Sequence, residues 1–391
     1  MQEEEDMKQI RFVVIIVILV LMILVIEPPL KQEILMTVSQ LNQISDISSL
    51  FRNQPSIGAS AAILFDPASQ TILYSKKADI QRAPASTTKI MTAILAIERC
   101  SLDEVVTISH RAATINGSQV GLREGEVYTV EKLLWSLLLQ SGNDAAISLA
   151  EHIAGSVEDF AKYMNARARE LGCKHTNFVN PHGLSDPNHY STVHDLALMA
   201  SHALRYPLFQ EIVSSKEKEI PWQKSFDKYL KNTNKLLWIM QGADGVKTGT
   251  TNLAGACLVS SATRDSRQVI AVVLNSSNRW VESARLLEWG FTNTECLKVI
   301  EKNETIPDIY AQKSQRYVVG YVKGDVYVSV PKGVKPYMHF APYQLVAPIA
   351  KDQLLGFLEV GPVADFASVR RQPVYALTKV GQKRSFLGIG F

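Results

Sequence analysis

QSGNDAA, residues 140–146, separates two apolar helical segments with residue types that favour turns and helix caps. ASTTKIM (85–91) lies upstream of it, and DGVKTGTT (244–251) lies downstream. The pattern S-x-x-K occurs four times in the chain and K-T-G once, but only Ser86 is followed first by S-x-N and then by K-T-G. Order and spacing, rather than any single motif, therefore support a common site.

Length and composition narrow the class of protein. A chain of 391 residues can form two domains, and its net charge of +3 without a basic block argues against a nucleic-acid partner. The four cysteines, at positions 100, 173, 257 and 296, are widely spaced and form no C-x-x-C pair. They signal neither a zinc site nor a disulfide framework, and we interpret them as small core residues.

The N-terminus predicts export. Residues 12–26 carry no polar side chain, and Lys8 and Arg11 precede them. Basic residues on the leading side keep the start of the chain in the cytoplasm, so residues 1–27 are predicted to be a cytoplasmic head with a membrane anchor or signal segment. Because no A-x-A cleavage site follows promptly, an uncleaved anchor on the extracytoplasmic face is favoured over secretion to the wall. Residues 28–55 are interpreted as a stalk.

Residues 56–295 are predicted to form an α+β domain with an antiparallel sheet. A helix begins at Ser86, a favoured N-cap residue, and the signal stays mostly helical to about Arg205. A closing helix is expected to end in LLEWGF, residues 286–291. Early and late strands then share one sheet around an inserted helical region. The expected strands are 59–65, 71–76, 246–250, 256–262 and 269–274.

Residues 297–385 are predicted to form a separate small β domain. Residues 317–322 and 326–330 alternate with period two around Lys323-Gly324-Asp325, as expected for a hairpin. Residues 343–348 and 354–360 predict a second hairpin of the same kind.

Ser86 and Lys89 have the spacing of a nucleophile and its base. Residues three apart lie on one face of a helix, and a serine hydroxyl needs a neighbouring base to become a nucleophile. Lysine can serve only if burial and a second cation, for which Lys247 is the candidate, lower its pKa. The alternative is an N-capping serine beside a solvated lysine.

Ser141 and Asn143 supply a second hydroxyl and an amide. The hydroxyl can relay a proton between a base and a leaving amine, and the amide can hold both a lysine and a substrate carbonyl. The alternative is a turn between helices that Ser141 caps.

Lys247, Thr248, Gly249 and Thr250 lie on an expected strand. Gly249 permits close approach of another backbone, and the N–H of Thr250 can point at a substrate. Lys247 and Arg279 suit a carboxylate. The alternative for Lys247 is an exposed edge lysine that discourages aggregation.

His182, His189 and His194, with Asp195, are spaced unlike common helix-borne metal sites. We therefore expect them to order the Asn180–Gly183 loop, and we predict no metal.

Several segments resemble the low-molecular-weight penicillin-binding proteins of the serine D-alanyl-D-alanine carboxypeptidase family. They are APASTTKIMTA, LLLQSGNDAA, NFVNPHGL followed by HYST, DGVKTGTT and LLEWGF. The resemblance covers about residues 55–295 closely and the β domain more loosely. It implies a β-lactamase/transpeptidase-like fold with a helical subdomain.

The resemblance also implies roles for the motif residues. Ser86 would attack the bond between the last two D-alanines of a peptidoglycan stem peptide, with Lys89 as its base, and Ser141 and Asn143 would pass the proton and hold the chain. The terminal carboxylate would be bound by Lys247, Thr248 and Arg279. The N–H groups of Ser86 and Thr250 would form the oxyanion hole. β-Lactams would acylate Ser86, and no cofactor is implied.

Some relatives carry a basic residue ahead of K-T-G, at the position where this chain has Thr233. The affinity for substrate is therefore expected to differ from theirs. A class A β-lactamase is disfavoured because no E-x-x-L-N segment precedes K-T-G. A D,D-endopeptidase acting on cross-links has the same residues and stays open. An inert wall-binding scaffold is the non-enzymatic alternative.

Overall fold

The computed structural model describes residues 54–223, 226–314, 316–362 and 369–382. The expected anchor at 12–26 and nearly all of the expected stalk lie outside them. No helix within the described ranges is both long enough and apolar enough to cross a membrane.

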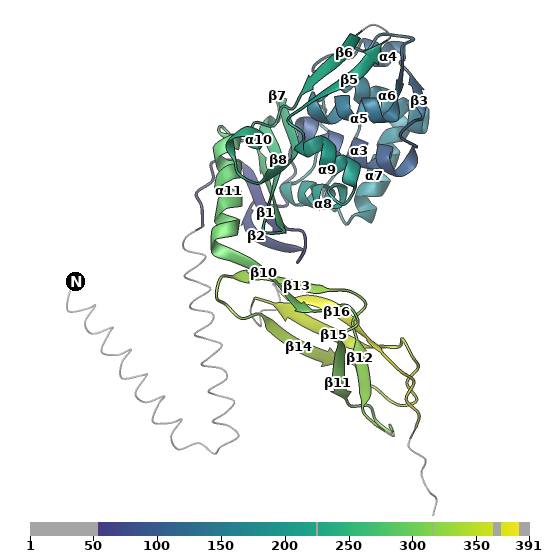
Figure 1. Ribbon diagram of the computed structural model, residues 1–391, viewed down its shortest axis with the longest axis vertical. Helices are drawn as coiled ribbons and strands as arrows, with labels where there is room; N and C mark the ends of the chain where they lie inside the picture. The colour runs from purple at the N-terminus through teal and green to yellow at the C-terminus, as the bar shows by residue number, and fades with distance from the viewer. Residues whose placement is uncertain (1–53, 224–225, 315, 363–368, 383–391) are drawn as a thin grey trace, which may run out of the picture.

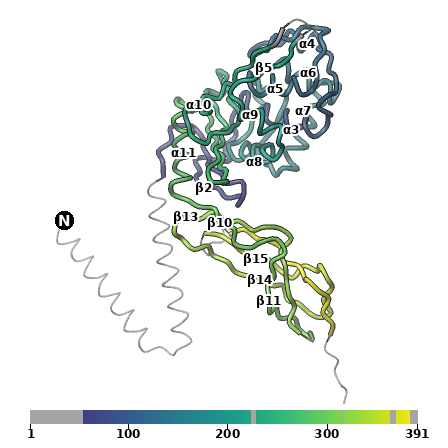
Figure 2. Tube along the Cα trace, in the orientation of Figure 1, coloured from purple at the N-terminus to yellow at the C-terminus, as the bar shows by residue number. Residues whose placement is uncertain are grey.

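A five-stranded antiparallel sheet forms the base of the larger domain, in the order β2-β1-β9-β8-β7. Early strands pair with late ones, as predicted, from Ala61 opposite Leu274 to Phe65 opposite Ile270. Figure 2 shows the purple early strands beside the green helix α11 (Arg279–Asn293). The strands are β1 (Ala61–Asp66), β2 (Thr71–Lys76), β7 (Ala243–Thr251), β8 (Gly255–Arg264) and β9 (Arg267–Leu274).

Strand β1 is buried on both faces because helices cover the sheet from both sides. Ile63 and Phe65 pack into the core of the helical region, whereas Leu64 belongs to the core beneath α11. Gly290 of α11 lies so close to the sheet that a Cβ there would stand 2.7 Å from Leu64 Cδ2. This close packing fixes α11, and with it Arg279 at its first turn.

The helical region is inserted between β2 and β7 (Figure 1). Helix α3 lies at its centre and contacts α5, α6, α7 and α8. The helices are α3 (Lys89–Arg99), α4 (His110–Ala113), α5 (Val130–Leu139), α6 (Asn143–Ala154), α7 (Val157–Glu170), α8 (Val193–Ala203), α9 (Pro207–Ser214) and α10 (Leu236–Ile239). Two small hairpins join them: β3 (Val105–Thr107) with β4 (Val127–Thr129), and β5 (Glu217–Gln223) with β6 (Phe226–Lys231).

The predicted start of the first helix at Ser86 is wrong by three residues. Ser86 lies in the 3₁₀ turn η1 (Ala85–Thr88), and α3 begins at Lys89. The hydroxyls of Thr87 and Thr88 donate to the carbonyls of Pro84 and Ala85, at 2.7 and 2.9 Å. These local bonds favour the tighter turn over an α-helical one.

The second region is all β. Strand β10 (Thr294–Ile300) follows α11 directly and pairs with β13 (Val326–Pro331). The other strands form a five-stranded sheet in the order β11-β12-β16-β15-β14. They are β11 (Thr305–Ile309), β12 (Val318–Tyr321), β14 (Tyr337–Pro342), β15 (Leu354–Gly361) and β16 (Arg370–Ala376).

Both hairpins predicted in this region are wrong. β12 pairs with β11 and β16 instead of β13, and β15 pairs with β14 and β16 instead of residues 343–348. Period-two alternation tells which side chains are buried, but it does not identify the neighbouring strand.

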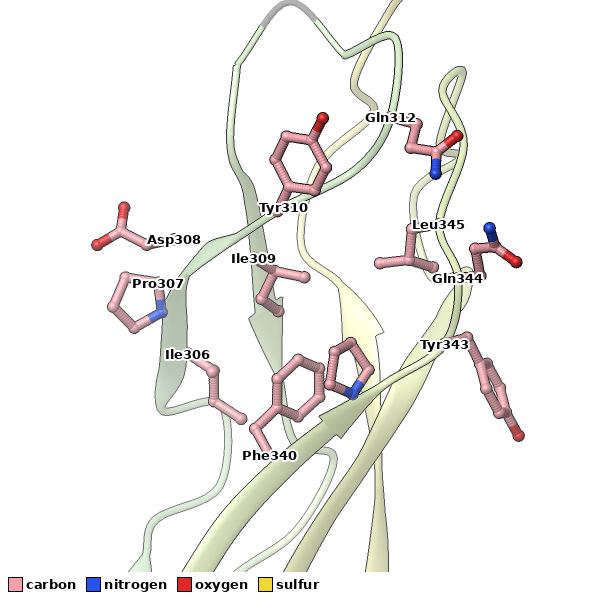
Figure 3. Close-up of a pocket in the computed structure, with 11 residues that line it drawn as sticks. Ile306, Pro307, Asp308, Ile309, Tyr310, Gln312, Phe340, Tyr343, Gln344 and Leu345 are labelled. Carbon is pink, nitrogen blue, oxygen red and sulfur yellow. The ribbon is translucent and has the colours of Figure 1, made fainter. Parts of the chain in front are cut away.

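A cavity of about 430 Å³ lies in this β region, between β11 and the end of β14 (Figure 3). Ile306, Ile309, Phe340 and Leu345 form its apolar lining, and the tyrosine at 310 stands above them. All its lining residues belong to the β region, so it is separate from the site that the motifs predict.

The two regions are joined by a buried polar network. Asp66, at the end of β1, accepts hydrogen bonds from Arg267 at 3.0 Å and from Ser329 of β13 at 2.8 Å. The hydroxyls of Ser69 and Ser329 are also 2.8 Å apart.

Candidate active site

Ser86 lies on a strained turn at the end of the sheet. Its neighbour Ala85 has φ +49°, in the left-handed region that a residue with a side chain seldom adopts. The 3₁₀ geometry eclipses residues three apart and so brings Lys89 to the side of Ser86. The Lys89 Nζ donates to Ser86 Oγ at 3.1 Å.

Lys89 is completely buried, so it is not the solvated lysine of the alternative interpretation. Its Nζ also donates to Asn143 Oδ1 at 2.7 Å and to the carbonyl oxygen of His182 at 2.9 Å. Burial first, and then the charge of Lys247, lower the Lys89 pKa well below its usual value, with partial opposition from Asp144. The side chain is therefore held at the serine hydroxyl in a setting that favours the neutral amine.

Ser141 and Asn143 stand at the junction of α5 and α6. Ser141 has φ +63°, and its hydroxyl is buried without a hydrogen-bond partner among the described residues. It does not cap the helix, because the N-cap residue of α6 is Gly142. The Asn143 amide donates to the carbonyl of Asn116 at 2.7 Å. Asn143 is thus oriented toward Lys89, while Ser141 keeps a free hydroxyl at a strained position.

Lys247 comes from β7, the edge strand that packs against the Ser86 turn. It is 1% exposed, so the interpretation as an exposed edge lysine is wrong. Burial, followed by the charge of Arg279, lowers the Lys247 pKa to about 7. A Cβ on Gly249 would lie 2.9 Å from Ser86 N and 3.0 Å from Pro84 O. Glycine therefore permits the close contact between β7 and this turn.

Arg279 completes a cationic surface beside β7. Its guanidinium donates to Gly249 O and Thr250 Oγ1, both at 2.8 Å, and stacks over the ring of Trp280. Burial lowers its pKa. Thr248 Oγ1 lies 2.7 Å from Thr233 Oγ1. Among the described residues, Lys247 and Arg279 hydrogen-bond to neutral oxygens, so positive charge suited to an anion gathers beside β7.

His182 and His189 accept hydrogen bonds from the backbone on either side of the Asn180–Gly183 loop, as predicted, whereas among the described residues His194 makes no hydrogen bond to it. His182 is buried, which lowers its pKa to about 3, and its carbonyl faces Lys89. His189 shares a hydrogen bond with Thr88 at 2.8 Å, and His194 pairs with Asp79 at 3.1 Å. His182 and His189 thus support the turn that holds Ser86, and each histidine has its own role.

The three motifs therefore meet at one place. The Ser86 hydroxyl lies beside an amine with a lowered pKa, the Asn143 amide bonds to the same amine, and the strand that carries Lys247 packs against the Ser86 turn. Such an arrangement suits acyl transfer from a substrate that carries a carboxylate. A family model described as D-alanyl-D-alanine carboxypeptidase matches residues 49–278. The chain belongs to this family.

Relatives agree with the assignment. The D-alanyl-D-alanine carboxypeptidase DacF of Bacillus subtilis is 35% identical, over 77% of this chain and 80% of the relative. DacC of Escherichia coli is 34% identical, over 85% and 87%.

Solved structures extend the agreement to the fold. Penicillin binding protein 5 of Haemophilus influenzae shares 32% identity and a TM-score of 0.76, covering 84% of this chain and 99% of that one. A DD-transpeptidase of Streptomyces shares 35% identity and a TM-score of 0.58, covering 61% and 99%.

Two features of the site were not predicted from the sequence. The Asp144 carboxylate accepts hydrogen bonds from the N–H groups of Val120, Gly121 and Leu122, at 2.9, 2.9 and 3.2 Å, and so pins the loop above Asn143. The carbonyl of His182 is the second. The only sequence feature that could have indicated Asp144 is its position directly after Ser-Gly-Asn. A backbone carbonyl such as that of His182 cannot be found from sequence, because every residue has one.

Proposed function

We propose that this protein is a serine-type D-Ala-D-Ala carboxypeptidase that removes the terminal D-alanine from peptidoglycan stem peptides through an acyl-enzyme and is inhibited by β-lactams. The observation that carries the proposal is the placement of Lys89. Its amine joins the hydroxyl of Ser86 to the amide of Asn143 in a fully buried setting.

Acylation begins with Ser86. Its Oγ attacks the carbonyl carbon of the penultimate D-alanine while its proton passes to neutral Lys89 Nζ. The backbone N–H groups of Ser86 and Thr250 receive the developing oxyanion. The C–N bond then breaks, and the amine of the leaving D-alanine takes a proton that the Ser141 hydroxyl relays from Lys89. That hydroxyl has no hydrogen-bond partner among the residues that the structure describes, which supports this role.

Recognition of the substrate's end belongs to β7 and the first turn of α11. Lys247, Thr248 and Arg279 bind the terminal carboxylate, whose charge offsets the repulsion between the two cations. A bound carboxylate thereby favours the protonated form of Lys247. Gly249 lets β7 pack against the Ser86 turn, which keeps the carboxylate-binding residues beside Ser86. Water then attacks the acyl-enzyme, with Lys89 again as base, and releases the shortened peptide.

The test is labelling of the purified protein with a fluorescent penicillin, together with D-alanine release from a stem pentapeptide. We expect the wild type to be labelled stably and to release D-alanine, and Ser86→Ala to do neither. A folded wild type that is not labelled would favour the inert scaffold. Rapid turnover of a chromogenic cephalosporin would contradict the carboxypeptidase assignment and favour a β-lactamase.

Two other reactions use the same acyl-enzyme. A D,D-endopeptidase hydrolyses a cross-link, and a transpeptidase, as the Streptomyces relative is named, passes the acyl group to an amine. Incubation with monomeric and with cross-linked muropeptides separates them. We expect D-alanine from the monomers, little cleavage of cross-links and no new dimers.

We also propose that residues 12–26 hold the protein on the outer face of the cytoplasmic membrane. The support is the apolar run behind Lys8 and Arg11. Membrane fractionation of cells that carry the chain or a version lacking residues 1–27, together with protease access from outside, tests it. Recovery in the medium of a shortened chain that lacks the N-terminal segment would indicate cleavage instead.

A further inference from the structure

Three potential metal ligands converge at the ends of α3 and α6. Cys100 is the C-cap residue of α3, Glu104 ends the turn that follows, and His152 lies in the last turn of α6. A sulfur, a carboxylate oxygen and an imidazole nitrogen from these side chains lie within 4.8 Å of one another. This is the only group of its kind in the part of the chain that the structure describes.

The local fold holds the three side chains together. The Cys100 N–H bonds to Ala96 O as α3 ends, and Glu104 N bonds to Ser101 O at 3.1 Å, closing a tight turn. The Ser101 N–H donates to Glu104 Oε1 at 2.5 Å. One carboxylate oxygen is thus fixed by the backbone, while Oε2 lies 2.9 Å from His152 Nε2. A carboxylate oriented in this way is typical of supported metal ligands.

The ligand types favour zinc. Thiolate, imidazole and carboxylate are the side chains that bind Zn²⁺, and three protein ligands leave a fourth tetrahedral position for water. Other imidazole–carboxylate pairs of the described residues, such as His110 with Glu124 and His194 with Asp79, are not joined by a thiol. Cys100 is what distinguishes this cluster from such ion pairs.

We propose that Cys100, Glu104 and His152 form a Zn²⁺ site. The spacing of the cysteines along the sequence did not reveal it, because the ligands come from separate elements. The site joins the C-terminal ends of α3 and α6. These helices begin with Lys89 and Asn143, whose side chains are 2.7 Å apart. The ion would therefore clamp, at its far end, the helix pair that carries the active site.

The test is titration of the metal-free full-length protein, untagged and in detergent, with Co²⁺ and then Zn²⁺. We expect one Co²⁺ per chain, a sulfur-to-cobalt charge-transfer band, tetrahedral absorption and displacement by Zn²⁺. Zn²⁺ should also raise the melting temperature. A titration without saturation, or a cobalt spectrum without the thiolate band, would overturn the proposal.

Variants assign the ligands. We expect Cys100→Ser and His152→Gln to abolish the charge-transfer spectrum. Loss of a residue that only supports a ligand costs about 10-fold to 100-fold in affinity, so Glu104→Gln should cost at least that. Cys296→Ser, at another half-buried cysteine, and His194→Gln, from an ion pair without a thiol, should bind Co²⁺ like the wild type. Unchanged binding by Cys100→Ser would refute the site.

A second readout needs no variant. Zn²⁺ should protect Cys100 of the wild type from alkylation, measured by mass spectrometry, while leaving the rate at Cys296 unchanged. Equal rates at Cys100 with and without the metal would contradict the proposal. Penicillin labelling of each variant without metal verifies that the domain is folded, and it keeps this test independent of peptidase activity.

Discussion

Lys89 and Lys247 are both buried amines, but their proposed roles require different protonation states. As proposed, Lys89 acts when neutral and Lys247 when protonated. Burial lowers both pKa values, and the charge of Lys247 lowers that of Lys89 further. The pH dependence of acylation should therefore report on both residues.

Acylation by penicillin should fall on both sides of an optimum. It falls at low pH as Lys89 becomes protonated, and at high pH as Lys247, whose pKa is about 7, loses its proton. In Lys247→Gln the basic limb should disappear. The acidic limb should move to higher pH, because removal of a neighbouring cation raises the Lys89 pKa. The rate at the optimum should fall about 10-fold to 100-fold, as for a lost hydrogen bond to a charged group.

The measurement is the second-order rate of labelling across the pH range. Lys235→Gln, which removes the same charge from an exposed position, is the control and should leave the profile unchanged. An acidic limb that stays in place in Lys247→Gln would contradict the coupling of the two amines.

Gly249→Ala should separate β7 from the nucleophile. The new Cβ would lie 2.9 Å from Ser86 N, so the turn or the strand must shift. A shift of about 1 Å costs about 100-fold in rate, and we expect that loss in penicillin labelling. Gly324→Ala, whose Cβ meets nothing within 4 Å, is the control. A labelling rate within about threefold of the wild type would show that the contact does not position Ser86.

Among single residues, the sequence predicted that Ser86, Lys89, Ser141, Asn143 and Lys247 are neighbours. The order of the three motifs was enough, because each motif is defined by its side chains. It did not predict the His182 carbonyl as a partner of Lys89, since any residue can supply a carbonyl. Nor did it predict that Thr233 contacts Thr248. That contact depends on how the segment before β7 folds back.

The start of α6 and the loop over it act as one element. Asn143 donates its amide to Asn116 O, and its backbone N–H bonds to Ser118 O at 2.7 Å. The carboxylate of Asp144, the next residue, accepts hydrogen bonds from the N–H groups of Val120–Leu122, further along the same loop. The loop and the helix therefore hold Asn143 from two sides.

Asp144→Asn should loosen this loop. The amide lacks the charge that attracts three N–H groups, and poorly satisfied buried donors cost about 1–3 kcal/mol. We expect that loss in urea unfolding and faster hydrogen exchange at residues 116–122. Asp159→Asn, which breaks an exposed pair with Lys162, is the control and should cost about 1 kcal/mol at most. Unchanged exchange in the loop would show that Asp144 is not its anchor.

The positions of the strands were easier to predict than the pairing between them. The strands of the catalytic sheet were found because turn residues such as Arg264-Asp265-Ser266 separate them and connect sequential neighbours. In the β region, β12 and β13 are also separated by turn residues, yet they belong to different sheets. Their buried valines, Val318 and Val328, satisfy the same alternation with any partner, so the pairing is decided by contacts distant in sequence.

At the scale of the whole molecule, Asp66 is the main polar link between the two regions. It is fully buried, and its carboxylate accepts from Arg267 and from Ser329 of β13. Loss of this charge would leave the guanidinium of Arg267 without its ion-pair partner at the junction.

Asp66→Asn should cost about 3–5 kcal/mol in the free energy of unfolding, because one partner of a buried ion pair is removed. Urea denaturation measures the loss. Penicillin labelling of the folded fraction should be unchanged, since Asp66 lies outside the site. Glu158→Gln, in an exposed pair with Arg111, is the control. A loss for Asp66→Asn no larger than the control's would mean that the junction contributes little to stability.

The strand order has a consequence for synthesis of the chain. β1 is flanked by β9, and Glu282 accepts from the N–H of Ala59 across 223 residues of sequence. Closing a loop of that length costs roughly 5 kcal/mol in chain entropy before any contact repays it. A nascent polypeptide therefore carries Ser86, Lys89 and Ser141, the proposed nucleophile, base and relay, long before β9 exists to complete the sheet. We therefore expect chains that terminate upstream of β9 to be inactive, so that activity would report complete translation of this domain.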